Sequence, residues 1–300
     1  MSTASPAGVV VVGSASVDLT AASTRRPAPG ETLLGESFSL VLGGKGANQA
    51  IAASRAGAPT RFVGCVGEDD FATVVRDGLA EAGVDLAHLR TVPGRTGIAH
   101  IRVDADGEND IVVVPLANSC LTAEQVDAAL AEGTARVLLT QLEIPTEVAL
   151  HALAAAHRRG VLTILDPAPA PAQPLPAELW PLLDVVTPNE TEAEQITGAA
   201  DPEAAAHWFL ARGTRAALIT CGAAGSLLVT AAGTTEIPAR EVEVVDTTAA
   251  GDALAGYLAA RLAAGDELAA AAHIAAVAGS LAVTRRGASP SIPAADEVLA

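Results

Sequence analysis

Short runs of apolar, β-branched residues alternate with segments of helical periodicity along most of this 300-residue chain. An apolar run without polar alternation is typical of a strand that is buried on both faces of a parallel sheet. After several of these runs the chain reaches a polar residue and then a glycine turn or a helix start. This order predicts an α/β fold with a doubly wound, mostly parallel sheet, whose ligand site gathers at the carboxyl ends of the strands. The predicted buried strands are residues 9–12, 61–66, 137–142, 161–165, 184–187 and 218–220.

A hairpin pattern interrupts this alternation. Two β-rich runs, residues 96–103 and 110–114, flank the turn-forming sequence DADGEND. With the segment that precedes residue 42, they predict a small β lid of about residues 14–42 and 96–116, inserted into a single α/β domain of residues 1–300. Closure of such a lid would keep water away from a bound substrate.

The net charge, the N-terminus and the cysteines indicate which partners and which compartment to expect. The net charge is −17 and the calculated pI is about 4.6. Such a surface repels nucleic acid and anionic membranes, so we expect neither as a partner. The N-terminus has no basic segment ahead of its apolar run, and no apolar stretch is long enough to span a bilayer, so we predict a cytoplasmic protein. Cys65, Cys120 and Cys221 form no CxxC pair, and we interpret them as buried thiols in a reducing compartment.

The stretch EVEVVDTTAAGDALAGYLAA combines a β-branched run at residues 242–245, a turn from Thr248 to Gly251 and a helical pattern. We predict that a strand ends here and that the turn leads into a helix. The free N–H groups and the dipole at the start of that helix favour an anion. Asp252, in the first helical turn, either caps the helix or accepts a proton from an attacking hydroxyl group.

The tetrapeptide AAGD is by itself a weak signal, because it occurs again at residues 263–266. The second copy lies between two helical patterns. We expect Gly265 to end the first helix and Asp266 to cap the next one. Only the segments around the first copy give it a functional meaning.

A second glycine-rich segment, GGKGANQA, opens another predicted helix. It matches neither GxxxxGK[ST] nor GxGxxG, so it is neither a Walker loop nor a Rossmann fingerprint. Its glycines, with Lys45 and Asn48, predict a tight turn that brings backbone and polar side chains to a small polar ligand. Asp18 follows the first predicted strand and either binds that ligand or forms a turn.

Taken together, these motifs resemble those of the ribokinase family of ATP-dependent sugar and nucleoside kinases. The matching segments are VVVVGSASVDL, GGKGANQA, DGEN, LTQLEIP, DPAPA, TPNETEAEQITG, ITCGAAG, VDTTAAGDALAG and VTRRGASPSIP, in this order from residue 9 to about 293. The combination of GGKGAN, NETE and DTTAAGD is specific.

The resemblance implies a role for each motif residue. Asp252 is implied as the base, and the N–H groups of Ala249, Ala250 and Gly251 as an anion hole for the transferred phosphoryl group. The implied sugar-binding residues are Ser16, Asp18, Gly44, Lys45, Asn48 and Glu143. The implied residues for ATP and magnesium are Asn189, Glu192, Thr220, Gly222 and Gly225. A potassium ion is implied between Asp246, Thr248, Ala282, Arg285, Gly287 and Ser291.

The chain also departs from the family pattern. Ser16 stands where the family usually has asparagine, and Leu116 where it often has glycine beside the sugar. Ala276 stands where many members have a polar residue at the adenine, and His273, one turn earlier, is a candidate replacement. The first two departures concern the identity of the sugar, and they leave the chemistry unchanged.

The resemblance predicts an ATP-dependent kinase that phosphorylates the primary hydroxyl of a pentose, D-ribose first, and acts as a homodimer through the lid. Deoxyribose, a ketohexose and adenosine are alternative substrates. The scarcity of aromatic residues, 2% of the chain, disfavours a nucleoside, whose base needs a stacking surface. A non-catalytic sugar sensor and a nicotinamide oxidoreductase are the alternatives from other classes, and the absence of GxGxxG places the oxidoreductase last.

Overall fold

A computed structural model describes residues 8–106 and 109–300 of the chain. Its largest unit is a nine-stranded sheet with the strand order β13-β12-β11-β10-β9-β8-β1-β4-β5. The pairs from β11 to β5 are parallel, and β12 and β13 pair antiparallel at one edge. The predicted doubly wound α/β fold is therefore confirmed. The strands are β1 (Val9–Val12), β4 (Thr60–Val66), β5 (Asp85–Thr91), β8 (Val137–Thr140), β9 (Leu162–Leu165), β10 (Val185–Val186), β11 (Ala216–Thr220), β12 (Ser226–Thr230) and β13 (Gly233–Ile237).

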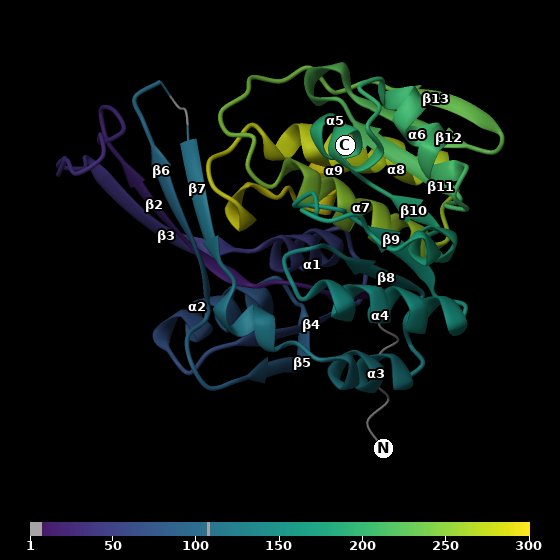
Figure 1. The fold of residues 1–300 in the computed structure, drawn as a ribbon, viewed down its shortest axis with the longest axis horizontal. Coiled ribbons are helices and arrows are strands. Elements are labelled where there is room, and N and C mark those ends of the chain that lie inside the picture. Colours follow the sequence, from purple (N-terminus) through teal and green to yellow (C-terminus); the bar gives the residue numbers. More distant parts are fainter. Residues whose placement is uncertain (1–7, 107–108) are drawn as a thin grey trace.

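Helices cover both faces of this sheet (Figure 1). The central strand β1 is apolar at every position because alternate side chains enter two separate cores: Val9 and Val11 pack with α1, α7 and α8, and Val10 and Val12 with α3 and α4. The helices are α1 (Lys45–Arg55), α2 (Asp70–Glu81), α3 (Ala123–Ala131), α4 (Thr146–Arg158), α5 (Glu190–Thr197), α6 (Pro202–Leu210), α7 (Ala250–Ala264), α8 (Leu268–Ala282) and α9 (Ala295–Val298). Short 3-10 turns are η1 (Leu116–Cys120), η2 (Ala177–Leu182), η3 (Gly222–Ala224) and η4 (Ser289–Ser291).

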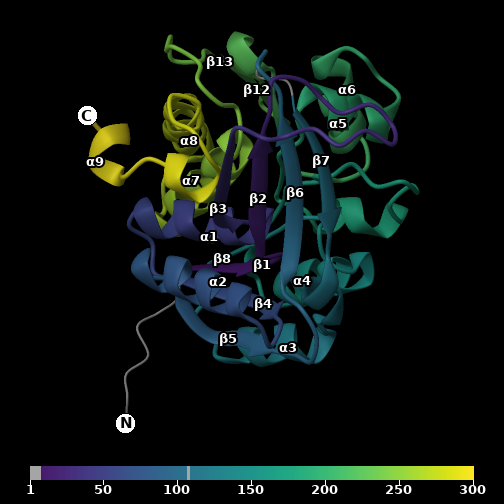
Figure 2. The same ribbon diagram turned by 90° about the vertical axis from the view of Figure 1, so that its left-hand side faces the viewer.

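A second, four-stranded sheet stands beside the large one and reaches past its carboxyl edge (Figure 2). Its strand order is β3-β2-β6-β7. It is built from two distant segments, β2 (Ser16–Ala22) with β3 (Ser37–Gly43), and β6 (Gly97–Val103) with β7 (Asn109–Val114). The turn expected at residues 107 and 108 lies outside the described residues.

The predicted strand at residues 242–245 is wrong. Val244 is 62% exposed and Val245 is 49% exposed, and the segment pairs with no strand of either sheet. Its backbone is instead tied to the end of α8, because Val245 N and Asp246 N both donate to Val283 O, at 2.8 and 3.1 Å. A β-branched run forms a strand only where a partner edge is available, and here a helix end supplies the acceptor.

Two smaller expectations also need correction. Gly265 ends α7 in the left-handed conformation as expected, but the N-cap of α8 is Glu267, and Asp266 accepts a hydrogen bond from Arg261 instead. Cys65 is buried, whereas Cys120 is exposed, so the three thiols are not all interior. Within residues 8–106 and 109–300, no helix is long and apolar enough to cross a membrane.

Candidate active site

Asp252 lies at the third position of α7 and is only 4% exposed. Its side chain turns away from the helix end and faces α1, where Oδ2 accepts from Asn48 Nδ2 at 2.9 Å and Oδ1 from Gln49 Nε2 at 3.1 Å. The two helices approach closely because Gly256 has no Cβ; one placed there would lie 2.5 Å from Gln49 O. Within the described residues, the Asp252 side chain therefore makes no capping hydrogen bond, and its role as proton acceptor stays a prediction.

The turn that begins α7 is strained. Ala249, the N-cap, has φ 61°, a left-handed conformation that residues with a Cβ rarely adopt, and it makes no side-chain cap bond. The N–H groups of Ala250, Gly251 and Asp252 occupy the first helical positions, which have no intrahelical acceptor. Ala250 N donates to Thr247 O at 3.4 Å, but the N–H groups of Gly251 and Asp252 have no acceptor among the described residues. These two groups at the end of a strained turn are suited to binding an anion.

The glycine-rich start of α1 is held by Glu143. The Glu143 carboxylate accepts from Ser14 Oγ at 2.6 Å and from Lys45 N at 3.0 Å. Gly44 has φ 89°, and a Cβ on it would meet Ser16 N at 2.8 Å. Both the left-handed backbone and the close approach of β2 therefore require glycine at this position.

Asp18 lies on β2 with its carboxylate over Gly43, where any side chain would collide with it. Burial raises the pKa of Asp18 to about 7, against the lowering effect of a 3.3 Å hydrogen bond from Ser16 Oγ. The negative charges of Glu143 and Asp252 raise this pKa further. The structure thus brings the predicted sugar-binding carboxylates to one place near Asp252.

Lys45 supplies positive charge to this acidic site. Burial alone would lower its pKa, but Asp252, Asp166, Glu143 and Glu192 together raise that pKa above the ordinary value, so the ammonium group stays charged. Burial raises the pKa of Asp252, and Lys45 is the largest influence that lowers it. Lys45 therefore favours the ionised form of the carboxylate that a proton acceptor needs.

Sequence reasoning missed Asp166, which follows β9 at the start of the proline-rich loop. Asp166 Oδ2 accepts from Gln49 Nε2 at 2.7 Å, and burial raises the pKa of Asp166 to about 8. A carboxylate at the carboxyl end of a buried strand is the signal that singled out Asp18, so the same rule would have found Asp166.

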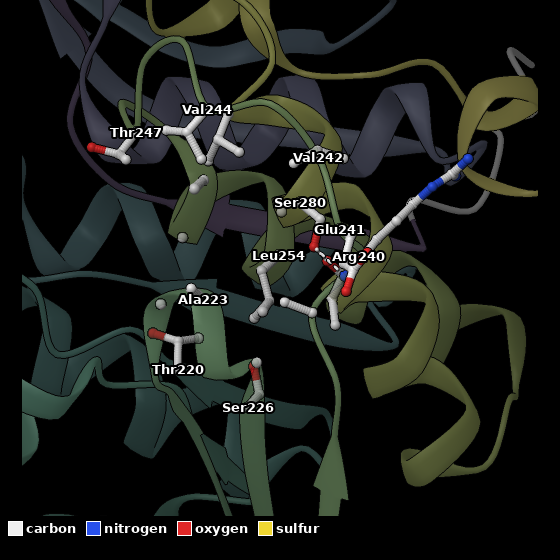
Figure 3. Close-up of a pocket in the computed structure, with 18 residues that line it drawn as sticks. Thr220, Ala223, Ser226, Arg240, Glu241, Val242, Val244, Thr247, Leu254 and Ser280 are labelled. Carbon is white, nitrogen blue, oxygen red and sulfur yellow. Dashed lines mark hydrogen bonds between the residues drawn. The ribbon is translucent and has the colours of Figure 1, made fainter.

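A cavity of about 450 Å³ lies beside the N-terminus of α7, between β11, β12 and α8 (Figure 3). The predicted nucleotide residues Thr220, Gly222 and Gly225 line it, as do Ala250 and Gly251 of the α7 turn. The turn that begins α7 thus opens into this cavity. Further lining residues are Arg240, Val242, Val244, Leu254, Ala276 and Ser280.

Ala276 reaches this cavity but His273 does not. His273 is exposed, and its Nδ1 is 2.8 Å from Ala269 O on the same helix. The suggestion that His273 replaces a polar residue at position 276 is therefore wrong. His273 lies about 4.5 Å along the axis of α8 from Ala276, and its ring bonds back to Ala269 O, so it does not reach the cavity.

Asn189 and Glu192 form a capping box at the start of α5. Asn189 Oδ1 accepts from Glu192 N at 2.8 Å, and Glu192 Oε2 accepts from Asn189 N at 2.9 Å. Asn189 also lies beside Thr220 through an isolated β-bridge. The capping box holds both side chains at the same sheet end as the cavity.

The residues predicted for a monovalent ion fall into two groups. Asp246 accepts from Thr248 N and Oγ1 at 2.9 and 2.6 Å and from Gly287 N at 2.9 Å. Burial raises the pKa of Asp246, but these hydrogen bonds outweigh it and lower the pKa below its ordinary value. Arg285 N donates to Ala282 O, and Ser291 Oγ donates to Ala288 O; among the described residues, no hydrogen bond joins Ala282, Arg285 or Ser291 to Asp246. In the described part of the chain, no cluster of three or more His, Cys, Asp or Glu residues forms a metal site.

Comparisons with known proteins agree with this geometry. The sequence model of the pfkB family carbohydrate kinases matches residues 6–295. A ribokinase of Staphylococcus aureus (strain COL) is 40% identical over 299 residues, which cover 97% of this chain and 98% of that protein. A deoxyribokinase of Salmonella typhi is 32% identical, with 96% of each chain covered. The structure of Arabidopsis thaliana ribokinase complexed with ribose and ATP matches with a TM-score of 0.89 at 32% identity and covers 97% of both chains.

Proposed function

Because the chain belongs to the pfkB family of carbohydrate kinases, we propose that it transfers the γ-phosphoryl group of ATP to the primary hydroxyl of D-ribose. The products are D-ribose 5-phosphate and ADP. The observation that carries this proposal is the position of Asp252. Its carboxylate contacts Asn48 on the predicted sugar side, and the turn that precedes it lines the large cavity.

In this reaction the sugar oxygen attacks the γ-phosphorus and the bond to the β-phosphate oxygen breaks. Asp252 accepts the proton that the hydroxyl group loses. The N–H groups of Ala249, Ala250 and Gly251 stabilise the charge that develops on the transferred group. Positioning and charge stabilisation account for most of the catalysis, because phosphoryl transfer demands little covalent chemistry of the protein.

The sugar binds between Asp18, Gly44, Asn48 and Glu143, with Ser16 and Lys45 beside them. Asn48 Oδ1 is buried and has no hydrogen-bond partner among the described residues. A buried amide oxygen without a partner costs about 1–3 kcal/mol, which a sugar hydroxyl would recover by donating to it. This unpartnered oxygen supports a polyhydroxylated substrate.

We propose residues for two metal ions, magnesium and potassium. The carboxylate and amide oxygens of Glu192 and Asn189 are hard ligands that suit the water shell of magnesium. Magnesium bound there would offset the negative charge of the phosphates. For potassium we propose Asp246, with Thr248, Ala282, Arg285, Gly287 and Ser291 as the oxygen donors; the lowered pKa of Asp246 keeps one donor ionised.

We further propose that the chain works in the cytoplasm as one domain whose four-stranded sheet is a lid, and that two lids pair in a homodimer. Exposed apolar side chains on that sheet, including Phe38 and Val112, support the pairing.

Steady-state kinetics with ATP and a panel of sugars tests the proposed activity, with and without potassium. We expect D-ribose to have the highest kcat/KM and potassium to raise kcat. The deoxyribokinase relative makes 2-deoxy-D-ribose the second candidate, and a higher kcat/KM for it would replace ribose as the substrate. No turnover of any sugar or nucleoside by folded protein would leave the sugar-sensor alternative standing.

A further inference from the structure

Two glutamine side chains, Gln49 and Gln141, are completely buried beneath Asp252. Gln49 lies on α1 and Gln141 directly follows β8, 92 residues apart along the chain. Gln141 Nε2 donates to Gln49 Oε1 at 2.6 Å. Gln49 Nε2 in turn donates to Asp252 Oδ1 at 3.1 Å and to Asp166 Oδ2 at 2.7 Å.

These contacts allow one orientation of the Gln49 amide. Its nitrogen has two hydrogen atoms, and each one is directed to a carboxylate. A flipped amide would present its oxygen to both carboxylates and its nitrogen to the donor group of Gln141. The two acidic side chains thus select this orientation, and Gln141 supports it by donating to the Gln49 oxygen. Gln49 and Asn48 together hold the carboxylate of Asp252.

The position of Gln141 costs free energy, because one of its polar atoms has no partner in the described part of the chain. Its Oε1 is buried without a hydrogen-bond partner among the described residues, and it rests where a Cβ on Gly13 would collide with it. A buried polar atom without a partner is uncommon and calls for an explanation. Holding the Gln49 amide in place provides one.

We propose that Gln49 is a positioning residue, which holds the Asp252 carboxylate toward the sugar hydroxyl, and that Gln141 acts through Gln49. Asn48 donates to the other carboxylate oxygen, so the two amides of α1 each hold one oxygen of Asp252 by a hydrogen bond. Each oxygen keeps a lone pair for the substrate. This inference rests on the proposed kinase activity.

Replacing Gln49 with leucine keeps the size of the side chain and removes its hydrogen bonds. Gln49→Leu is expected to lower kcat about 10- to 100-fold while the KM for ribose changes less than about threefold, because a hydrogen bond to a charged group is lost. The acidic limb of the kcat/KM profile is expected to move to higher pH, because the ionised form of Asp252 loses a donor. The other charged groups that influence Asp252 are Lys45, Glu143, Asp166 and Asp18.

A double-mutant cycle separates positioning from a general loss of structure. In an Asp252→Asn background, Gln49→Leu is expected to have little further effect on kcat, because the group that it positions is gone. An equal loss of kcat in both backgrounds would overturn the inference. So would wild-type kcat and pH dependence in a folded Gln49→Leu variant.

Gln141→Leu provides a second test that leaves Gln49 in place. We expect Gln141→Leu to lower kcat several-fold and to move the acidic limb of the kcat/KM profile to higher pH. Unchanged kcat and pH dependence would refute the action of Gln141 through Gln49, even if Gln49→Leu does not fold. Thermal unfolding establishes that each variant is folded. Wild-type protein without kinase activity would refute the proposed function instead, so the two failures are distinguishable.

Discussion

At the scale of single residues, the two copies of AAGD have the same sequence but place their aspartates in different environments. Asp252 is buried between two amide donors, whereas Asp266 is partly exposed and pairs with Arg261. We predict that Asp252→Asn lowers kcat about 10²- to 10⁴-fold and leaves the KM for ribose nearly unchanged, because a proton acceptor is lost but the amide keeps the shape. Asp266→Asn, in the same tetrapeptide, is the matched control and is expected to retain wild-type kcat. Similar kcat losses in both variants would contradict the role of Asp252.

Asp18 predicts a dependence of stability on pH. Its pKa rises from 3.8 to about 7 on folding, so the folded protein retains a proton that the unfolded chain releases between about pH 4 and pH 7. The contribution of Asp18 to stability therefore falls as the pH rises through this window. Moving the pKa this far corresponds to at most about 4 kcal/mol.

We accordingly predict that Asp18→Asn, without sugar, raises the free energy of unfolding by up to about 4 kcal/mol at pH 8 and by little at pH 4. Urea unfolding of the wild type and the variant at both pH values measures this difference. An equal effect at pH 4 and pH 8 would show that burial of this carboxylate carries no such cost.

At the scale of elements, the contact between α1 and α7 sets the geometry of the site. We predict that Gly256→Leu destabilises the protein by about 3 kcal/mol and lowers kcat, because the added atoms push α7 away from α1 and separate Asp252 from Asn48. Ala264→Leu places the same side chain on the exposed end of α7 and is expected to change the unfolding free energy by less than about 0.5 kcal/mol. Urea unfolding and kcat of both variants provide the test, and equal effects would refute it.

The elements that sequence reasoning found and those it missed differ in where their partners lie. The strands of the large sheet were predictable because burial on both faces makes them apolar throughout, as in β1. Residues 242–245 have the same β-branched character, but their backbone partner is Val283 at the end of α8, which no local pattern reveals. The links from Gln49 to Asp166, Gln141 and Asp252 likewise join residues 92 to 203 positions apart, so only the folded chain brings them together.

At the scale of the whole molecule, the four-stranded sheet has two unlike faces. The pairing register places Asp18, Ala99 and Val113 on one face, the one that carries the proposed sugar-binding carboxylate. Ile111 lies on this face as well, two positions from Val113. Phe38 and Val112 lie on the opposite face, where both side chains are exposed, and this is the face proposed to pair in the homodimer.

Adjacent residues of β7 therefore test the proposed homodimer. Val112 is 60% exposed and Ile111 is 50% exposed, but they point to opposite faces. We predict that Val112→Glu raises the dimer dissociation constant about 100-fold or more, because a charge would be buried in an apolar interface. Ile111→Glu adds the same charge one residue away and is expected to leave the dimer intact. Sedimentation velocity over a concentration series measures both constants, and a monomeric wild type, or equal dissociation of the two variants, would refute pairing through this face.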